Sequence, residues 1–138
     1  MRNKTIYMTD NDLERLNDLV YVLKGTDSRD NGSVELLKQE MERARVMSAL
    51  NILGDVVTMN SRIRVKDLMT GEDLIFQIVY PADVDLEKGK ISVLSPVGMA
   101  LLGYQVGEVV SWKVPGGVRR LKIEEMLYQP KAVGDFFH

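Results

Sequence analysis

Two aspartates in a short polar segment are the residues of this 138-residue chain that could most readily take part in chemistry. Asp27 and Asp30 lie three residues apart within the turn-forming stretch 25–32, between two predicted helices. Two carboxylates on a projecting tip could share a Mg²⁺ ion if a partner supplied further oxygen ligands. The alternative is a plain turn, because Asp, Ser, Asn and Gly are common turn residues. Two acids are too few for a self-sufficient metal site, so composition alone favours the turn.

The composition removes most other kinds of covalent chemistry. The chain has no cysteine, which excludes disulfides, zinc-thiolate sites and thiol nucleophiles. Its single histidine, His138, is the last residue, so Ser-His-Asp arrangements and histidine-rich metal sites are not expected. We therefore expect no cofactor, no metal site within the chain and no enzyme activity. A binding or regulatory role is favoured.

The charge balance limits the partners. The chain has 18 basic and 20 acidic side chains, for a formal net charge of −2. This balance argues against tight binding to duplex DNA, which needs a surplus of Lys and Arg on one face. No apolar run approaches the roughly 18 residues of a membrane span, and the polar start is not typical of a signal peptide. We expect a cytoplasmic protein without membrane contact or strong nucleic-acid binding.

The first half of the chain has the hydrophobic period of helices. Thr9 with Asp12 three residues later resembles a capping box, and Ser33 is placed to begin a second helix. Each is followed by apolar residues at three- and four-residue steps, namely Leu13, Leu16, Leu19, Val20 and Leu23, then Val34, Leu37, Met41, Ala44 and Met47. We predict an antiparallel helical hairpin, a short coiled coil, within residues 1–54. Each helix would have about 15 residues and measure roughly 22 Å.

The second half changes to the alternating period of strands. The predicted strands cover 62–66, 74–80, 91–94, 109–114 and 118–128, and a predicted short helix covers 96–102. The Pro-Gly-Gly turn at 115–117 lacks the following Lys-Ser/Thr of a phosphate loop and predicts a hairpin. The aromatic residues Phe76, Tyr80, Trp112 and Tyr128 could line a pocket, but aromatics on strands are more often core. We predict an α+β chain whose second unit, 55–138, is a mostly antiparallel sheet.

Several spaced motifs in this second unit resemble the C-terminal domain of the GreA/GreB transcript-cleavage factors. They are the strand-like run 89–94, the Ser95-Pro96 pair with its short helix, Val106-Gly107-Glu108, and Pro115-Gly116-Gly117. In that family, motifs in this order lie on an FKBP-like sheet, and the resemblance extends over about residues 56–130. Two further stretches, 55–62 and 128–130, together with the short hairpin resemble the Rnk branch, whose members are called regulators of nucleoside diphosphate kinase.

The resemblance implies binding to bacterial RNA polymerase at the rim of its secondary channel. Carried onto this chain, the contact surface is Leu94, Ser95 and Pro96, with Leu94 where some cleavage factors have an acid. In Gre factors a long coiled coil carries two tip acids to the polymerase centre, and Asp27 and Asp30 are the loosely matching residues here. The predicted helices are about half as long as a Gre arm, a shortfall on the order of 20 Å.

A gap of that size would keep the tip acids away from the roughly 2 Å needed to ligand a Mg²⁺ ion. We therefore predict a polymerase-binding regulator that does not itself stimulate cleavage and that competes with Gre factors. Three alternatives remain open: an active cleavage factor that uses Asp27 and Asp30, a direct regulator of nucleoside diphosphate kinase, and a prolyl isomerase of the FKBP fold.

Overall fold

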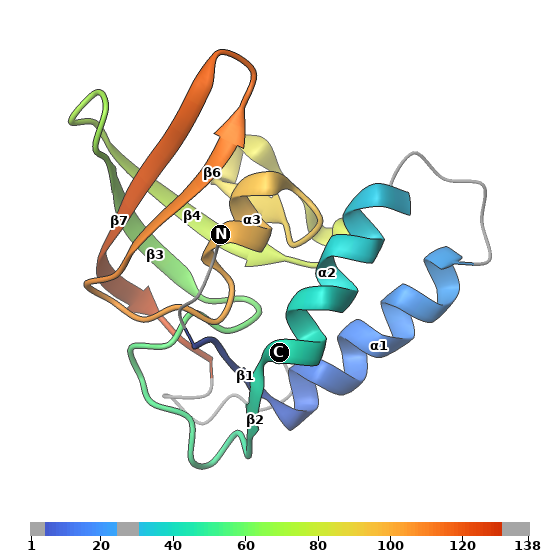
Figure 1. The fold of residues 1–138 in the computed structure, drawn as a ribbon. Coiled ribbons are helices and arrows are strands. Elements are labelled where there is room, and N and C mark those ends of the chain that lie inside the picture. Colours follow the sequence, from blue (N-terminus) through green and yellow to red (C-terminus); the bar gives the residue numbers. More distant parts are fainter. Residues whose placement is uncertain (1–4, 25–30, 131–138) are drawn as a thin grey trace.

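A computed structural model describes residues 5–24 and 31–130 (Figure 1). The helices and strands are, in order, β1 (Tyr7–Thr9), α1 (Asp10–Lys24), α2 (Asn31–Arg43), β2 (Arg45–Met47), β3 (Arg62–Asp67), β4 (Asp73–Val79), β5 (Lys90–Ser92), α3 (Pro96–Leu101), β6 (Val109–Val114) and β7 (Gly117–Tyr128). Two single-turn 3₁₀ helices, Pro81–Asp83 and Leu86–Lys88, lie between β4 and β5. The predicted α+β class is confirmed.

The main sheet has five strands in the order β5-β4-β3-β7-β6. Neighbouring strands are antiparallel, except that β5 runs parallel to β4. Irregularities in the β3–β7 register let the long strand β7 curl around the core. The five predicted strands and the short helix all occur within a few residues of their predicted bounds. The alternation of polar and apolar residues was therefore a sound guide to this half.

The end of the second predicted helix was wrong. The apolar stripe was extended to Met47, but α2 ends at Arg43 and residues 45–47 form β2. β2 pairs in parallel with β1, and the Arg45 N–H donates to the Ile6 carbonyl at 2.9 Å. Three-residue strands leave no periodic signal, and pairing with a distant segment overrode the local helical pattern.

Helices α1 and α2 lie side by side against the sheet domain (Figure 1). The predicted stripes supply their buried contacts, with Leu16 and Val20 on α1 and Val34 and Leu37 on α2. These side chains belong to the same hydrophobic core as the inward-facing residues of the sheet. Packing against the sheet therefore stabilises the two helices in addition to their local propensity.

The predicted division at residues 54 and 55 falls in the loop between β2 and β3. We propose that the division separates two folding units that share one core. Across the junction, the Tyr7 N–H donates to the Gly103 carbonyl at 3.0 Å. Gly103 has a positive φ of 87°, and a Cβ there would lie 2.8 Å from the Ile6 Cβ.

None of the helices in the described residues is long and apolar enough to span a membrane.

Candidate docking site

The turn before α3 is built by two serine hydroxyls. The Ser92 hydroxyl accepts the Leu94 N–H at 3.0 Å. The Ser95 hydroxyl donates to the Ser92 carbonyl at 2.7 Å and accepts the Gly98 N–H at 3.1 Å. Ser95 is thus the N-cap of α3, and Pro96 at the first helical position needs no N–H partner there. These bonds fix the turn that carries the predicted contact residues.

Gly98 allows this turn to close. A Cβ at Gly98 would lie 2.2 Å from the Ser92 carbonyl oxygen, which real Cβ atoms essentially never do. The backbone of α3 can therefore approach the end of β5 only because this position has no side chain. The Ser-Pro-x-Gly spacing of the sequence is a steric requirement of the turn.

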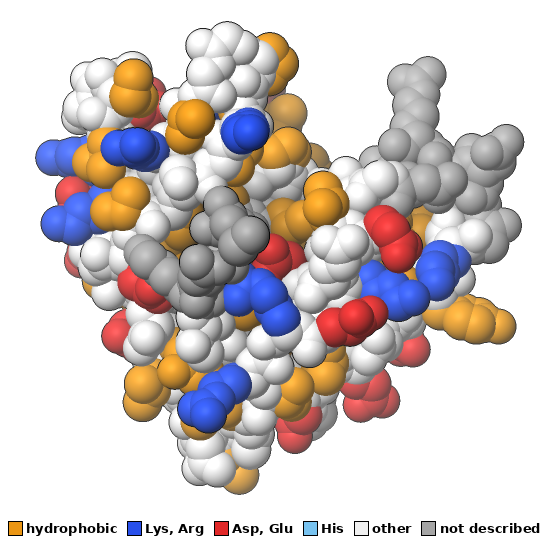
Figure 2. All heavy atoms as spheres, in the orientation of Figure 1, with side chains coloured by type: hydrophobic (Ala, Val, Ile, Leu, Met, Phe, Trp, Pro, Cys, Tyr) orange, Lys and Arg blue, Asp and Glu red, His pale blue; other side chains and the backbone are white. Residues whose placement is uncertain are grey.

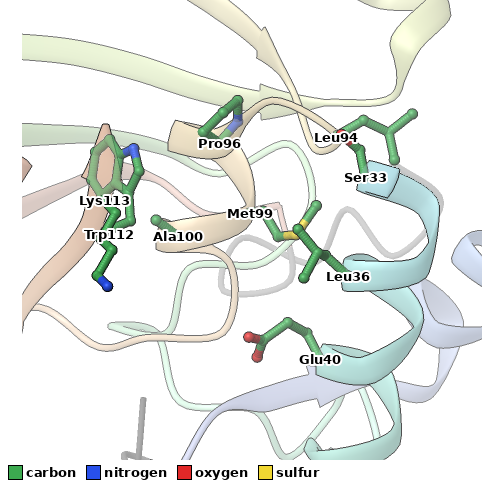
Figure 3. A pocket seen from close by; sticks show the side chains of 9 residues that line it. All are labelled: Ser33, Leu36, Glu40, Leu94, Pro96, Met99, Ala100, Trp112 and Lys113. Atoms are coloured by element: carbon green, nitrogen blue, oxygen red, sulfur yellow. The ribbon is translucent and has the colours of Figure 1, made fainter. Parts of the chain in front are cut away.

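A cleft of about 330 Å³ lies between α2 on one side and α3 with β6 on the other (Figure 3). Its lining combines one face of α2 with the start of α3 and one end of β6, namely Ser33, Leu36, Glu40, Leu94, Pro96, Met99, Ala100, Trp112 and Lys113. Most of these side chains are apolar, while Glu40 and Lys113 bring opposite charges to the lining. Such a surface suits a protein partner with a hydrophobic segment.

Two of the three predicted contact residues, Leu94 and Pro96, line this cleft, and Ser95 lies between them in the turn. Pro96 is exposed, whereas Leu94 is only 6% exposed and contributes one apolar side of the wall. The Ser95 hydroxyl is occupied by its two bonds within the turn. Of the three, Pro96 is the exposed one, while the Ser95 hydroxyl holds the shape of the turn.

Sequence reasoning did not identify the α2 side of the cleft. Leu36 lies off the predicted apolar stripe and is 54% exposed, although it is a large aliphatic residue in a helix. An apolar residue on the polar face of an amphipathic helix was the available signal. Trp112 was expected in the core, and it does pack there in part while also lining the cleft. Phe76 and Tyr80 also pack against the core.

A buried carboxylate joins α1 to the sheet domain. The Thr9 hydroxyl accepts the Asp12 N–H at 3.0 Å, as the capping spacing predicted. The Asp12 carboxylate accepts the Met59 N–H at 3.0 Å, 47 residues away, and only 2% of Asp12 is exposed. Burial, with the nearby Asp12 charge, raises the pKa of Tyr80 above its ordinary value, and the Arg15 guanidinium lies 4.3 Å from the Tyr80 ring centre. These groups fix the base of α1.

The tip acids Asp27 and Asp30 lie outside the described residues, and so does His138. Within residues 5–24 and 31–130, no group of three or more His, Asp or Glu side chains is arranged to hold a metal ion.

Comparisons with known proteins agree with this arrangement. Residues 52–128 match the family described as "Transcription elongation factor, GreA/GreB, C-term", and residues 4–47 match "Rnk N-terminus". The regulator of nucleoside diphosphate kinase from Escherichia coli K12 is 39% identical over 137 residues, covering 99% of this chain and 98% of that protein. GreA from Bartonella henselae is 32% identical over 108 residues, covering 78% of this chain and 69% of that protein.

A solved structure supports the same relationship. The prokaryotic transcription elongation factor GreA/GreB from Nitrosomonas europaea superposes with a TM-score of 0.74 at 38% identity, covering 90% of this chain and all of that one. The fold and the sequence matches therefore define a protein of the GreA/GreB class. More narrowly, the chain belongs to the members of this family that join an Rnk N-terminus to a GreA/GreB C-terminal domain. The family resemblance predicted from sequence is confirmed.

Proposed function

We propose that this protein is a regulator of transcription that binds RNA polymerase at the rim of the secondary channel. The proposal also holds that it does not itself stimulate transcript cleavage and that it competes with Gre factors for the channel. The observation that carries the proposal is the exposed edge at Pro96, which lies beside an apolar cleft on a GreA/GreB domain. In this role the protein would act in the cytoplasm.

Helix length supports a role without cleavage. Helix α1 has 15 residues and α2 has 13, so at 1.5 Å per residue they measure about 22 and 20 Å. An arm of this length projects far less than the long coiled coil of a cleavage factor. Mg²⁺ requires its oxygen ligands at about 2 Å, so an acid at the end of a short arm cannot substitute for one that reaches the centre.

The cleft supports polymerase binding through its shape and chemistry. Leu36 and Pro96 are both exposed on opposite walls, and Met99 lies between them (Figure 3). Covering these apolar groups gives a favourable free energy of roughly 25 cal/mol for each Å² removed from water. The cleft also includes α2, so the Rnk-type helices contribute to the same binding surface as the GreA/GreB domain.

A binding titration with purified core RNA polymerase tests the proposal. Leu36→Asp places a charge in the apolar wall and is expected to weaken binding at least about tenfold, or 1.4 kcal/mol. Leu86→Asp is the matched control, because Leu86 is 75% exposed and does not line the cleft. Equal binding by both variants and the unaltered protein would exclude the cleft. Failure of the unaltered protein to bind would exclude the polymerase.

Nucleoside diphosphate kinase is the second candidate partner. It rests on the printed name of the Escherichia coli relative, which is 39% identical along nearly its whole length. A stoichiometric complex between the two purified proteins, in the absence of polymerase binding, would favour the kinase. Polymerase binding without a kinase complex would remove it.

A further inference from the structure

The outer face of the main sheet, away from the core, carries an excess of positive charge. Along β3 the buried residues Ile63 and Val65 alternate with outward-facing cationic side chains. Strands β6 and β7 contribute further outward-facing cationic side chains. We call six side chains the cationic face: Arg62, Arg64, Lys66, Lys113, Arg120 and Lys122. Three carboxylates stand among them, Asp73, Glu124 and Glu125. Six cations against three carboxylates leave a net charge of +3, in a chain whose net charge is −2.

Ion pairs within the fold do not account for all of these cations. The Arg64 guanidinium lies 3.3 Å from Glu125, and Lys66 and Lys122 share Glu124 at 3.9 and 4.0 Å. Lys66 and Lys122 are also directly opposite each other across the β3–β7 pair, which is destabilising for like charges.

Three members of the cationic face have no ion pair at all within the described part of the chain. No described carboxylate lies within 4.0 Å of the charged groups of Arg62, Lys113 or Arg120. Figure 2 shows Lys and Arg side chains interspersed with hydrophobic ones over the β6–β7 part of the molecule. Positive charge that is costly or unused within the fold is available to an external partner.

The chemistry of the face favours an acidic protein surface over a nucleic acid. The three carboxylates would repel a continuous phosphate backbone, whereas a protein can match both signs of charge. Exposed aliphatic side chains lie between the charges, with Ile75 46%, Val109 37% and Val118 44% exposed. Single-stranded nucleic acid is usually held by several stacking aromatic rings, and Tyr128 is the single aromatic residue on the outward positions of the main sheet's described strands.

The cationic face is continuous with the docking cleft. Trp112 and Lys113 are adjacent on β6, and both line the cleft (Figure 3). Lys113 is exposed at the rim, so the positive charge begins where the cleft ends. A partner seated in the cleft would extend directly over β6 toward Arg120 on the paired strand.

We propose that the cationic face is a second contact with RNA polymerase, which steers and orients the protein against an acidic surface next to the element held in the cleft. This inference rests on the proposed polymerase binding. It adds that the polymerase surface next to the element in the cleft is acidic. Electrostatic contacts of this kind act mainly on the association rate and weaken as salt screens them.

Charge reversal with a matched control tests this. Arg62→Glu/Arg120→Glu alters two exposed cations that have no ion pair among the described residues. Arg45→Glu/Lys88→Glu makes the same change in net charge at exposed positions off the face. The association rate constant with core RNA polymerase is measured at low and high salt, and thermal unfolding verifies that each variant is folded.

We expect the face variant to associate about tenfold more slowly than the control at low salt, with the difference shrinking at high salt. Equal rates for the two variants would overturn the second contact while leaving polymerase binding intact. Loss of polymerase binding by the unaltered protein would overturn both proposals. Single-stranded RNA serves as a second probe, and tight RNA binding abolished only by the face variant would overturn the acidic-protein partner in favour of nucleic acid.

Discussion

The starts of α1 and α3 use the same local motif for different purposes. In each, a side-chain hydroxyl accepts the backbone N–H of the residue three positions later. The Thr9 hydroxyl accepts the Asp12 N–H at 3.0 Å, and the Ser95 hydroxyl accepts the Gly98 N–H at 3.1 Å. At α1 the motif is buried, and the Asp12 carboxylate bonds to Met59 in the sheet domain. At α3 the next residue, Pro96, is exposed at the cleft.

The two caps differ in burial and in the residue that follows them. The buried cap at Thr9 is followed by Asp12, whose buried carboxylate accepts the Met59 N–H. This bond joins the Rnk-type helices to the GreA/GreB domain. The exposed cap fixes the backbone of a surface turn and leaves an apolar edge available for binding. Three substitutions test this comparison, beginning with the largest expected effect, and a fourth tests a carboxyl group at the end of β3.

Gly98→Ala should have the largest effect on stability. The added Cβ would meet the Ser92 carbonyl at 2.2 Å, so α3 must shift away from β5. We expect the free energy of unfolding, measured by denaturant titration, to fall by about 3 kcal/mol. The control is Gly32→Ala in α2, where nothing lies within 4 Å of the new Cβ. That variant should be unchanged or up to about 1 kcal/mol more stable, and similar losses in both would contradict the steric argument.

Asp12→Ala tests the buried start of α1. The substitution leaves the Met59 N–H buried without its carboxylate partner, so the free energy of unfolding should fall by about 2 kcal/mol. Asp10→Ala, two residues earlier and exposed, should change it by less than about 0.5 kcal/mol. If the two alanine variants unfold at the same denaturant concentration, the Asp12 contact does not hold the helices to the sheet.

Ser95→Ala tests the exposed start of α3. It removes both hydroxyl bonds of a half-buried cap, and we expect a loss of about 1 kcal/mol in chemical denaturation. Ser95→Thr keeps a hydroxyl at the same position and should retain most of that stability. A loss in Ser95→Ala that exceeds the loss in Asp12→Ala would reverse the comparison between the two caps.

The smallest effect is expected at Asp67, at the end of β3. The backbone N–H of Met69, helped by Arg119 and Thr70, lowers the pKa of this carboxyl below its ordinary value of 3.8. Because the folded-state pKa is lowered, the ionised carboxylate stabilises the folded protein at pH values above the unfolded-state pKa. This contribution is lost as the pH falls through the folded-state pKa. The stability difference between the unaltered protein and Asp67→Asn should therefore be present at pH 7 and shrink as the pH falls below about 4. A difference that does not vary between pH 7 and pH 3 would contradict this assignment.

Most of the fold was predictable because its patterns are local. Alternating side chains marked β3 and β4, and the spacing from Ser95 to Gly98 marked the start of α3. The pairing of β1 with β2 was not predictable, because three-residue strands are specified by a distant partner. The role of Asp12 was half predicted: its N–H follows the capping spacing, but its carboxylate bonds to a residue 47 positions away.

The candidate site divides in the same way. Family resemblance located Leu94, Ser95 and Pro96, and the structure places all three at one turn beside the cleft. Leu36 could not be assigned to that cleft from sequence, since nothing local indicates that α2 faces α3. The cationic face depends on which residues of three strands share one side, which requires the register of the sheet.

The central claim is that a short-armed GreA/GreB protein occupies the polymerase channel without promoting cleavage. The most direct test is transcript cleavage by stalled, backtracked elongation complexes, measured with this protein alone and with an added Gre factor. We predict no stimulation by the protein alone and a dose-dependent inhibition of the Gre factor that Leu36→Asp weakens. Stimulated cleavage that is lost in Asp27→Ala/Asp30→Ala would contradict the claim and make this chain a cleavage factor.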